Sequence, residues 1–174
     1  MQTATTAQQI KQYRNDGFVV HRGLLNSDAV QELKDAVLSA IAGMGTRKFA
    51  AAAGGQHSTD DEVSSFYQRV FTQRLHLRKI SETVNRYVLG PEIGRIITDL
   101  SGIDGFRIYF DQALIKEPYG NPTAWHLDAP GWPFYSQHVI TAWIALEEST
   151  LSNGCMCFIP GSHKIATHDN ASIS

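Results

Sequence analysis

Residues 126–128 read His-Leu-Asp within the run NPTAWHLDAPGWPF, and they are the part of the sequence best suited to bind a metal ion. In a β-strand, side chains two positions apart emerge on the same face, about 6.5 to 7 Å apart along the strand. The imidazole of His126 and the carboxylate of Asp128 can therefore reach one ion, while Leu127 points to the opposite face. A second histidine would complete the ligand set of non-haem Fe(II) oxygenases, which leaves coordination positions open.

A His-x-Asp tripeptide is weak support by itself, because it arises often by chance and can be a hydrogen-bonded pair at a strand end. The order of the surrounding motifs is far more specific. The chain opens with IKQYRNDGFVVHRGLL at 10–25 and continues after the tripeptide with TAWIALEEST at 141–150 and NGCMCFIPGSHK at 153–164. In this combination the sequence resembles the phytanoyl-CoA dioxygenase (PhyH) family of Fe(II)- and 2-oxoglutarate-dependent oxygenases, from about residue 8 almost to its last residues.

The resemblance implies a chemistry and a set of roles. His126 and Asp128 would bind Fe(II) as the catalytic metal ligands, and Gln112 and Trp143 would contact the cosubstrate 2-oxoglutarate. The family uses O2 to couple the decarboxylation of 2-oxoglutarate to the oxidation of a small organic substrate. Related halogenases have a small residue in place of the carboxylate, so Asp128 favours hydroxylation. Acyl-CoA thioesters, amino-acid derivatives and natural products are all family substrates, and the sequence does not choose among them.

Two family residues have no counterpart within these 174 residues: the distal histidine that is the third iron ligand, and the arginine that pairs with 2-oxoglutarate. We therefore expect residues 1–174 to be a single phytanoyl-CoA dioxygenase-like domain, truncated at its C-terminus, with negligible turnover of its own. The alternative is a catalytically inactive jelly-roll fragment, or a structural or binding protein with an incomplete metal site. A cupin-like metal protein would need more histidines around His126.

Five other residues could take part in chemistry, but simpler roles fit them better. Arg74 falls near a basic family position close to 2-oxoglutarate, yet we expect it to be solvated, and Lys116 is expected to be exposed at a strand exit. His163 could replace the third ligand, although its family counterpart does not bind iron and a structural role in a tight turn is favoured. Cys155 and Cys157 share one face of an expected strand, which favours small core residues over redox groups.

Composition and charge indicate a globular domain that acts on small molecules. The chain is 43% hydrophobic and 18% charged, which fits one soluble domain with its own core. A net charge of −2 gives no basic surface for nucleic acid or for an anionic membrane. No apolar run approaches the ~18 residues of a membrane helix, and no signal-peptide pattern is present. We expect a cytoplasmic protein with a small-molecule substrate, and the oligomeric state is not predicted.

Helical signals occupy the first 100 residues and strand signals follow. Thr6 and Gln9 have the spacing of a capping box, Gly17 is suited to end that helix, and Ser27 and Asp28 suit the start of a second one. The apolar stripe of the second helix is Val30, Leu33, Val37 and Ile41. Further helices are expected over 81–89 and 91–100, and strands over 18–21, 106–116, 124–128, 138–146 and 155–159.

These elements predict an α+β fold. The resemblance adds that the N-terminal helices would pack on a double-stranded β-helix, a jelly roll, that is only partly present here. Residues 42–65, rich in Gly and Ala and without a sustained period, are expected to form a loop near the site entrance that substrate binding orders.

Overall fold

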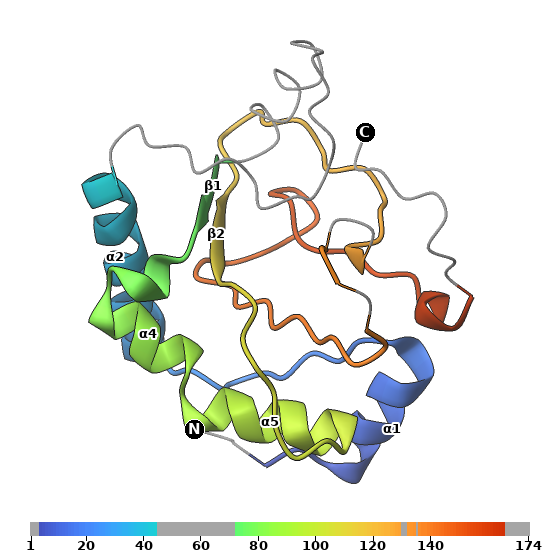
Figure 1. Cartoon of the computed structure of the whole chain (residues 1–174). Coiled ribbons are helices and arrows are strands. Elements are labelled where there is room, and N and C mark those ends of the chain that lie inside the picture. Colours follow the sequence, from blue (N-terminus) through green and yellow to red (C-terminus); the bar gives the residue numbers. More distant parts are fainter. Residues whose placement is uncertain (1–3, 45–71, 130–131, 135, 166–174) are drawn as a thin grey trace.

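The computed structural model describes residues 4–44, 72–129, 132–134 and 136–165. The helices come first along the chain, and Figure 1 shows them along the left and lower sides of the molecule, with the loop-rich second half on the remaining side. One antiparallel sheet joins two short strands, so the predicted α+β class is confirmed. The elements are α1 (Ala7–Asp16), α2 (Ser27–Met44), β1 (Thr72–Leu75), α4 (Glu82–Val88), α5 (Pro91–Ser101), β2 (Gln112–Ile115) and the 3-10 helices η1 (Leu77–Lys79) and η3 (Ser162–Lys164).

Helix α1 has the caps that its sequence predicts. The Thr6 hydroxyl accepts a hydrogen bond from the Gln9 amide at 3.2 Å, and the Gln9 side-chain oxygen accepts one from the Thr6 amide at 2.9 Å. This capping box satisfies two amide groups that the first turn would otherwise leave without partners. At the other end, Gly17 adopts a left-handed conformation with φ 85° and donates its amide to the Tyr13 carbonyl.

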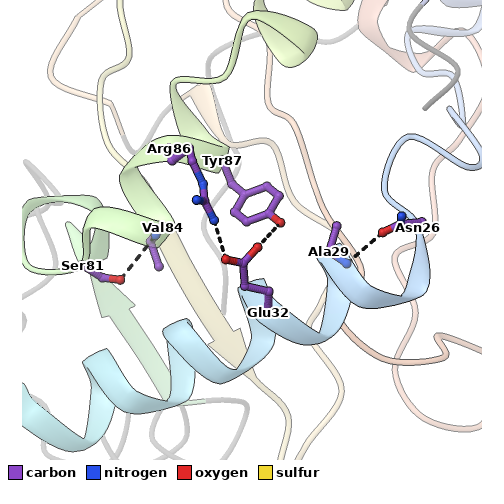
Figure 2. Close-up of polar contacts among 7 residues, drawn as sticks. All are labelled: Asn26, Ala29, Glu32, Ser81, Val84, Arg86 and Tyr87. Carbon is purple, nitrogen blue, oxygen red and sulfur yellow. Dashed lines mark hydrogen bonds and ion pairs between the residues drawn. The ribbon is translucent and has the colours of Figure 1, made fainter.

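Helix α2 begins at Ser27, in agreement with the predicted start at Ser27 and Asp28. Asn26 is its cap, since its side-chain oxygen accepts a hydrogen bond from the Ala29 amide at 2.9 Å (Figure 2). Ser27 and Asp28 lie in the first turn, where the carboxylate of Asp28 complements the positive end of the helix dipole. The predicted apolar stripe is confirmed in part, because Leu33 and Val37 are buried while Val30 and Ile41 are half-buried. Ala29, which is outside that stripe, is also buried.

Helices α4 and α5 follow the predicted ranges closely. The Ser81 hydroxyl caps α4 by accepting a hydrogen bond from the Val84 amide at 3.3 Å (Figure 2). Pro91 begins α5 at a position that needs no amide donor, and Gly102 ends it in a left-handed conformation with φ 74°. Buried Ile96 and Leu100 lie on α5, which packs against α1.

The hydrophobic core lies between α2, η1 and α4. Its buried centre is formed by Leu33 and Val37 from α2, Leu77 from η1 and Val84 from α4. Leu77 is 1% exposed and is the most enclosed of the four. At the surface, Glu32 of α2 accepts hydrogen bonds from the Arg86 guanidinium at 2.5 Å and the Tyr87 hydroxyl at 2.6 Å, as Figure 2 shows. Apolar side chains from the second half of the chain complete the core, among them Ala113, Ile144 and Leu146.

The sheet is much smaller than the sequence predicts. Strands β1 and β2 pair antiparallel with Thr72 opposite Ile115 and Leu75 opposite Gln112. Of the run 106–116 only 112–115 forms a strand, and the predicted strands over 18–21, 124–128, 138–146 and 155–159 are wrong, because no ladder of backbone hydrogen bonds joins them to another segment in the described part of the chain. Their alternating side chains are a local property, whereas a strand also needs a neighbour. The described residues therefore do not form a jelly roll.

Residues 155–165 return to the end of α1. The Gly161 amide donates to the Asp16 carbonyl at 2.9 Å, and the rings of Phe18 and Phe158 stack with centroids 4.9 Å apart. The imidazole of His163 lies directly over Gly17. In Figure 1 this contact brings the red end of the described chain beside the blue first helix. The N-terminal helix and the PGSHK motif therefore support one another.

One prediction falls largely outside the described residues. Of the expected loop over 42–65, residues 42–44 belong to α2, and the remainder is not described. Among the helices that are described, none combines the length and the apolar character needed to cross a membrane.

The contact between Gly17 and His163 predicts unequal effects of two glycine substitutions. Gly17 and Gly23 both have positive φ, 85° and 73°, so alanine at either site should cost about 1–2 kcal/mol of backbone strain. A methyl group at Gly17 would also collide with the His163 ring, whereas one at Gly23 would meet nothing within 4 Å. Urea unfolding should show a larger loss for Gly17→Ala than for Gly23→Ala, and His163→Ala should reduce that excess. Equal losses would contradict the contact.

Candidate metal centre

The side chains of His126 and Asp128 converge. The Nε2 atom of His126 lies 3.3 Å from Oδ1 of Asp128, and the two side chains are 25% and 53% exposed. Residues 120–128 contain no helix, and the two side chains approach one another from the segment that carries them. The pair is therefore open to solvent and able to approach a small ion together.

A backbone contact fixes the tautomer of His126. Its Nδ1 atom lies 2.8 Å from the carbonyl oxygen of Ala124, and because a carbonyl can only accept, Nδ1 must carry the hydrogen. In the neutral ring Nε2 is then an acceptor that faces the carboxylate of Asp128, so two lone pairs meet unless a cation lies between them. A histidine whose second nitrogen donates to a backbone carbonyl is the usual arrangement of a metal ligand.

The spacing of the two atoms suits a metal ion as that cation. Two donors that bind a first-row metal ion at ~2.1 Å and at right angles are separated by about 3 Å. A charge-assisted hydrogen bond from a protonated imidazole would normally be shorter, at roughly 2.7–2.9 Å. Within the described residues, however, no group of three or more His, Cys, Asp or Glu side chains is placed to hold an ion. The structure thus shows two suitable donors and does not supply a third.

Gln112 lies on the side of the sheet that faces away from the helices. Its neighbour Ala113 packs against the hydrophobic core, so alternation along β2 sends Gln112 to the opposite face. The side-chain oxygen of Gln112 accepts a hydrogen bond from Nε2 of Gln73 at 2.6 Å. Because that oxygen is engaged, the NH2 group is the part of Gln112 that can donate to a carboxylate.

Trp143 precedes a segment that docks on the helical layer. Ile144 and Leu146 pack against the core, and the Glu147 carboxylate pairs with Lys34 of α2 at 2.6 Å. Trp143 is 45% exposed, and because residues 138–146 do not form a strand, alternation does not give its direction. Of the two predicted cosubstrate residues, Gln112 therefore lies on the face of the sheet away from the helices, and Trp143 is an exposed side chain beside the docked segment. No hydrogen bond or ion pair of the described residues joins either of them to His126 or Asp128.

Three of the remaining candidates differ from expectation. Arg74 is half-buried rather than solvated, and its place opposite Ala113 puts it on the other face of the sheet from Gln112. Lys116 is also half-buried: its ammonium donates to the Asn121 carbonyl, which ties the exit of β2 to the segment before His126. Cys157 is exposed instead of lying in the core.

Cys155 and His163 have structural surroundings. Burial, followed by the nearby Cys157 thiol, raises the pKa of Cys155, which favours the unreactive protonated form. Both cysteines are free thiols. His163 lies against Gly17 at the end of α1, which agrees with the structural role expected for it.

Sequence reasoning missed an aromatic cluster whose members include residues that follow Asp128 in the chain. The Tyr109 and Phe134 rings meet edge to face with centroids 5.0 Å apart, and Trp132 stacks on Phe134 at 5.8 Å. The Trp132 amide donates to the Ala129 carbonyl at 3.1 Å, which ties Trp132 to the residue after Asp128. The signal in the sequence was the density of aromatic residues directly after the His-x-Asp tripeptide.

A groove of ≈ 280 Å³ lies elsewhere, over the helical layer. Leu24, Leu25, Tyr87 and Ile93 line it together with Ile144. None of the predicted site residues borders this groove. We therefore place the candidate metal centre at His126 and Asp128 and not in the groove.

Comparison with known proteins identifies the family. The profile of the family described as "Phytanoyl-CoA dioxygenase (PhyH)" matches residues 13–172, which is most of the chain. The chain belongs to the phytanoyl-CoA dioxygenase family. The resemblance drawn from the sequence motifs is thereby confirmed, and membership supports a dioxygenase function.

Several curated members of the phytanoyl-CoA dioxygenase family align with nearly all of this chain. A probable alpha-ketoglutarate-dependent hypophosphite dioxygenase of Stutzerimonas stutzeri is 24% identical over 96% of this chain and 57% of its own length. The peroxisomal phytanoyl-CoA dioxygenase of Mus musculus is 27% identical over 94% and 50%, and the phytanoyl-CoA dioxygenase domain-containing protein 1 of Bos taurus is 26% identical over 89% and 64%. The chain thus spans about half to two thirds of these relatives. No solved structure matches it significantly.

The ion pair between Lys34 and Glu147 predicts a pH dependence of stability. The hydrogen bond from Lys34, helped by the lysine charge, lowers the pKa of Glu147 in the folded state. The pair should therefore stabilise the fold above the unfolded-state pKa of Glu147, and this contribution should disappear as pH falls through the lowered pKa. Glu147→Gln should be slightly less stable than the native chain at neutral pH and equal to it in acid, as measured by urea unfolding.

The neighbouring residue provides the control for this prediction. Glu148→Gln removes a similarly exposed carboxylate that forms no ion pair among the described residues, so it should leave the pH profile unchanged. The stability difference between Glu147→Gln and the native chain should shrink in high salt, because the Lys34–Glu147 pair is exposed. A difference between Glu147→Gln and the native chain that grows toward acid pH would contradict the lowered pKa.

Proposed function

We propose that this protein is an Fe(II)- and 2-oxoglutarate-dependent dioxygenase that hydroxylates a small organic molecule. The observation that carries the proposal is the convergence of His126 Nε2 and Asp128 Oδ1 at 3.3 Å, with the imidazole held by the Ala124 carbonyl in the tautomer that a metal ligand needs. Family membership and the names of the relatives support the same cofactors, namely Fe(II), 2-oxoglutarate and O2.

In this proposal each residue has a defined task. His126 and Asp128 hold the iron, which when bound activates O2 for oxidation of the substrate. Gln112 donates its NH2 group to a carboxylate of 2-oxoglutarate, and Trp143 shields that cosubstrate from water. The Ala124 carbonyl keeps the His126 ring from rotating. We further propose the jelly roll as the fold of the whole catalytic domain, in keeping with the family.

The aromatic cluster supports a partly apolar substrate. Tyr109, Trp132 and Phe134 form edge-to-face and stacked contacts, two of them in the segment that follows the proposed ligands, and such surfaces favour apolar groups through burial of large ring areas. Asp128 in the place where related halogenases have a small residue supports hydroxylation. The two free cysteines are in keeping with a reducing compartment, and we propose the cytoplasm.

Metal binding provides the direct test. Calorimetric titration of the chain with Fe(II) and 2-oxoglutarate without O2 should show binding that His126→Ala and Asp128→Ala each weaken by about tenfold or more, because each removes a ligand. His163→Ala removes a histidine packed on Gly17 and is the matched control, with unchanged affinity expected. Succinate formation under O2, with a panel of apolar and polar organic acids, then measures turnover.

Three outcomes would count against the proposal. Titration without measurable binding would favour the alternative, a structural or binding protein with an incomplete metal site. Equal binding by the native chain and both ligand variants would place the metal elsewhere. Loss of binding in His163→Ala alone would make that histidine a ligand.

A further inference from the structure

Asp111 is a largely shielded acidic residue directly before Gln112. Its side chain is only 8% exposed, although a carboxylate is costly to bury without partners. The sequence around it, YFDQALI, gives no metal or catalytic pattern that would account for an acid at this position. Its contacts instead connect it to the other strand of the sheet.

Three contacts join Asp111 to the residues that follow β1. Its carboxylate accepts a hydrogen bond from the Arg78 amide at 3.0 Å, and its second oxygen lies 3.4 Å from Arg78 Nε. Both atoms of the longer contact are shielded from solvent and have no hydrogen-bond partner, so they interact mainly through charge. The Asp111 carbonyl also accepts from the His76 amide at 2.8 Å, one step beyond the last strand pair, Leu75 with Gln112.

The short sheet needs such a device. Each strand has four residues, and two-stranded sheets of this size are marginal by themselves. A slip by one residue would exchange the faces of the sheet, turning Gln112 toward the helices and Ala113 away from them. Strands β1 and β2 are separated in the chain by η1, α4 and α5, so no tight turn fixes their register.

We propose that Asp111 and Arg78 form a clamp that sets the register of β2 against β1 and thereby holds Gln112 on the face away from the helices. Asp111 is then a positioning residue for Gln112 and does not itself touch the cosubstrate. The consequence for 2-oxoglutarate rests on the proposed function, whereas the register of the sheet does not.

Hydrogen exchange of the native chain and its variants tests the clamp without any ligand. Asp111→Ala should speed exchange of the β1–β2 ladder amides by about tenfold or more, as expected for loss of a charge-assisted hydrogen bond. Asp111→Asn, which keeps an oxygen for the Arg78 amide but loses the charge, should have a smaller effect and serves if Asp111→Ala fails to fold. Asp104→Ala, at an exposed aspartate after α5, is the control, and α1 amides should exchange normally in all variants.

Binding of 2-oxoglutarate with Fe(II) tests the link to Gln112. Asp111→Ala and Gln112→Ala should weaken binding by the same factor, and the double variant should be no weaker than either, because both remove one contact. Unchanged ladder exchange in Asp111→Ala overturns the clamp, and additive effects on binding overturn its role for Gln112. If the native chain binds no 2-oxoglutarate, the proposed function fails, while the exchange data still decide the clamp.

Discussion

The packing of α2 against η1 and α4 is the contact on which the placement of the candidate site depends. Leu33 and Val37 meet Leu77 and Val84 in a core whose central residue is 1% exposed. Burial of each such side chain contributes roughly 1.5–3 kcal/mol, far more than an exposed ion pair. Ala113, Ile144 and Leu146 dock on the same core from the second half of the chain. The helical layer is therefore the support that orients the segments that carry Gln112 and Trp143.

Alternation along β2 converts this packing into the placement of Gln112. Because Ala113 turns toward the helices, Gln112 turns away from them. Surface pairs such as Lys34 with Glu147 strengthen the docking slightly. The shielded pair of Asp111 with Arg78 differs, because an error there would leave a carboxylate buried without a partner. Apolar burial thus brings the segments together, and the shielded charge selects one register among the alternatives.

An element could be predicted from the sequence when the residues that determine it lie close together in the chain. The ends of α1 and α5 were predictable because Thr6, Gln9 and Gly102 form hydrogen bonds or turns with residues only a few positions away. The strands were not predictable, because alternation describes one segment and a ladder needs two. Asp111 and Arg78 were missed for the same reason: 33 residues separate them, and neither has a local pattern.

The candidate site shows the same difference between local and long-range interactions. His126 and Asp128 belong to one short segment, so their convergence and the contact of His126 with the Ala124 carbonyl involve only residues 124–128. Gln112 keeps its face of the sheet only if the register of β2 against β1 is correct, and that register depends on residues distant in the sequence. A short motif can therefore set the geometry of the two proposed metal ligands, while the placement of the proposed cosubstrate residue Gln112 is left to the fold.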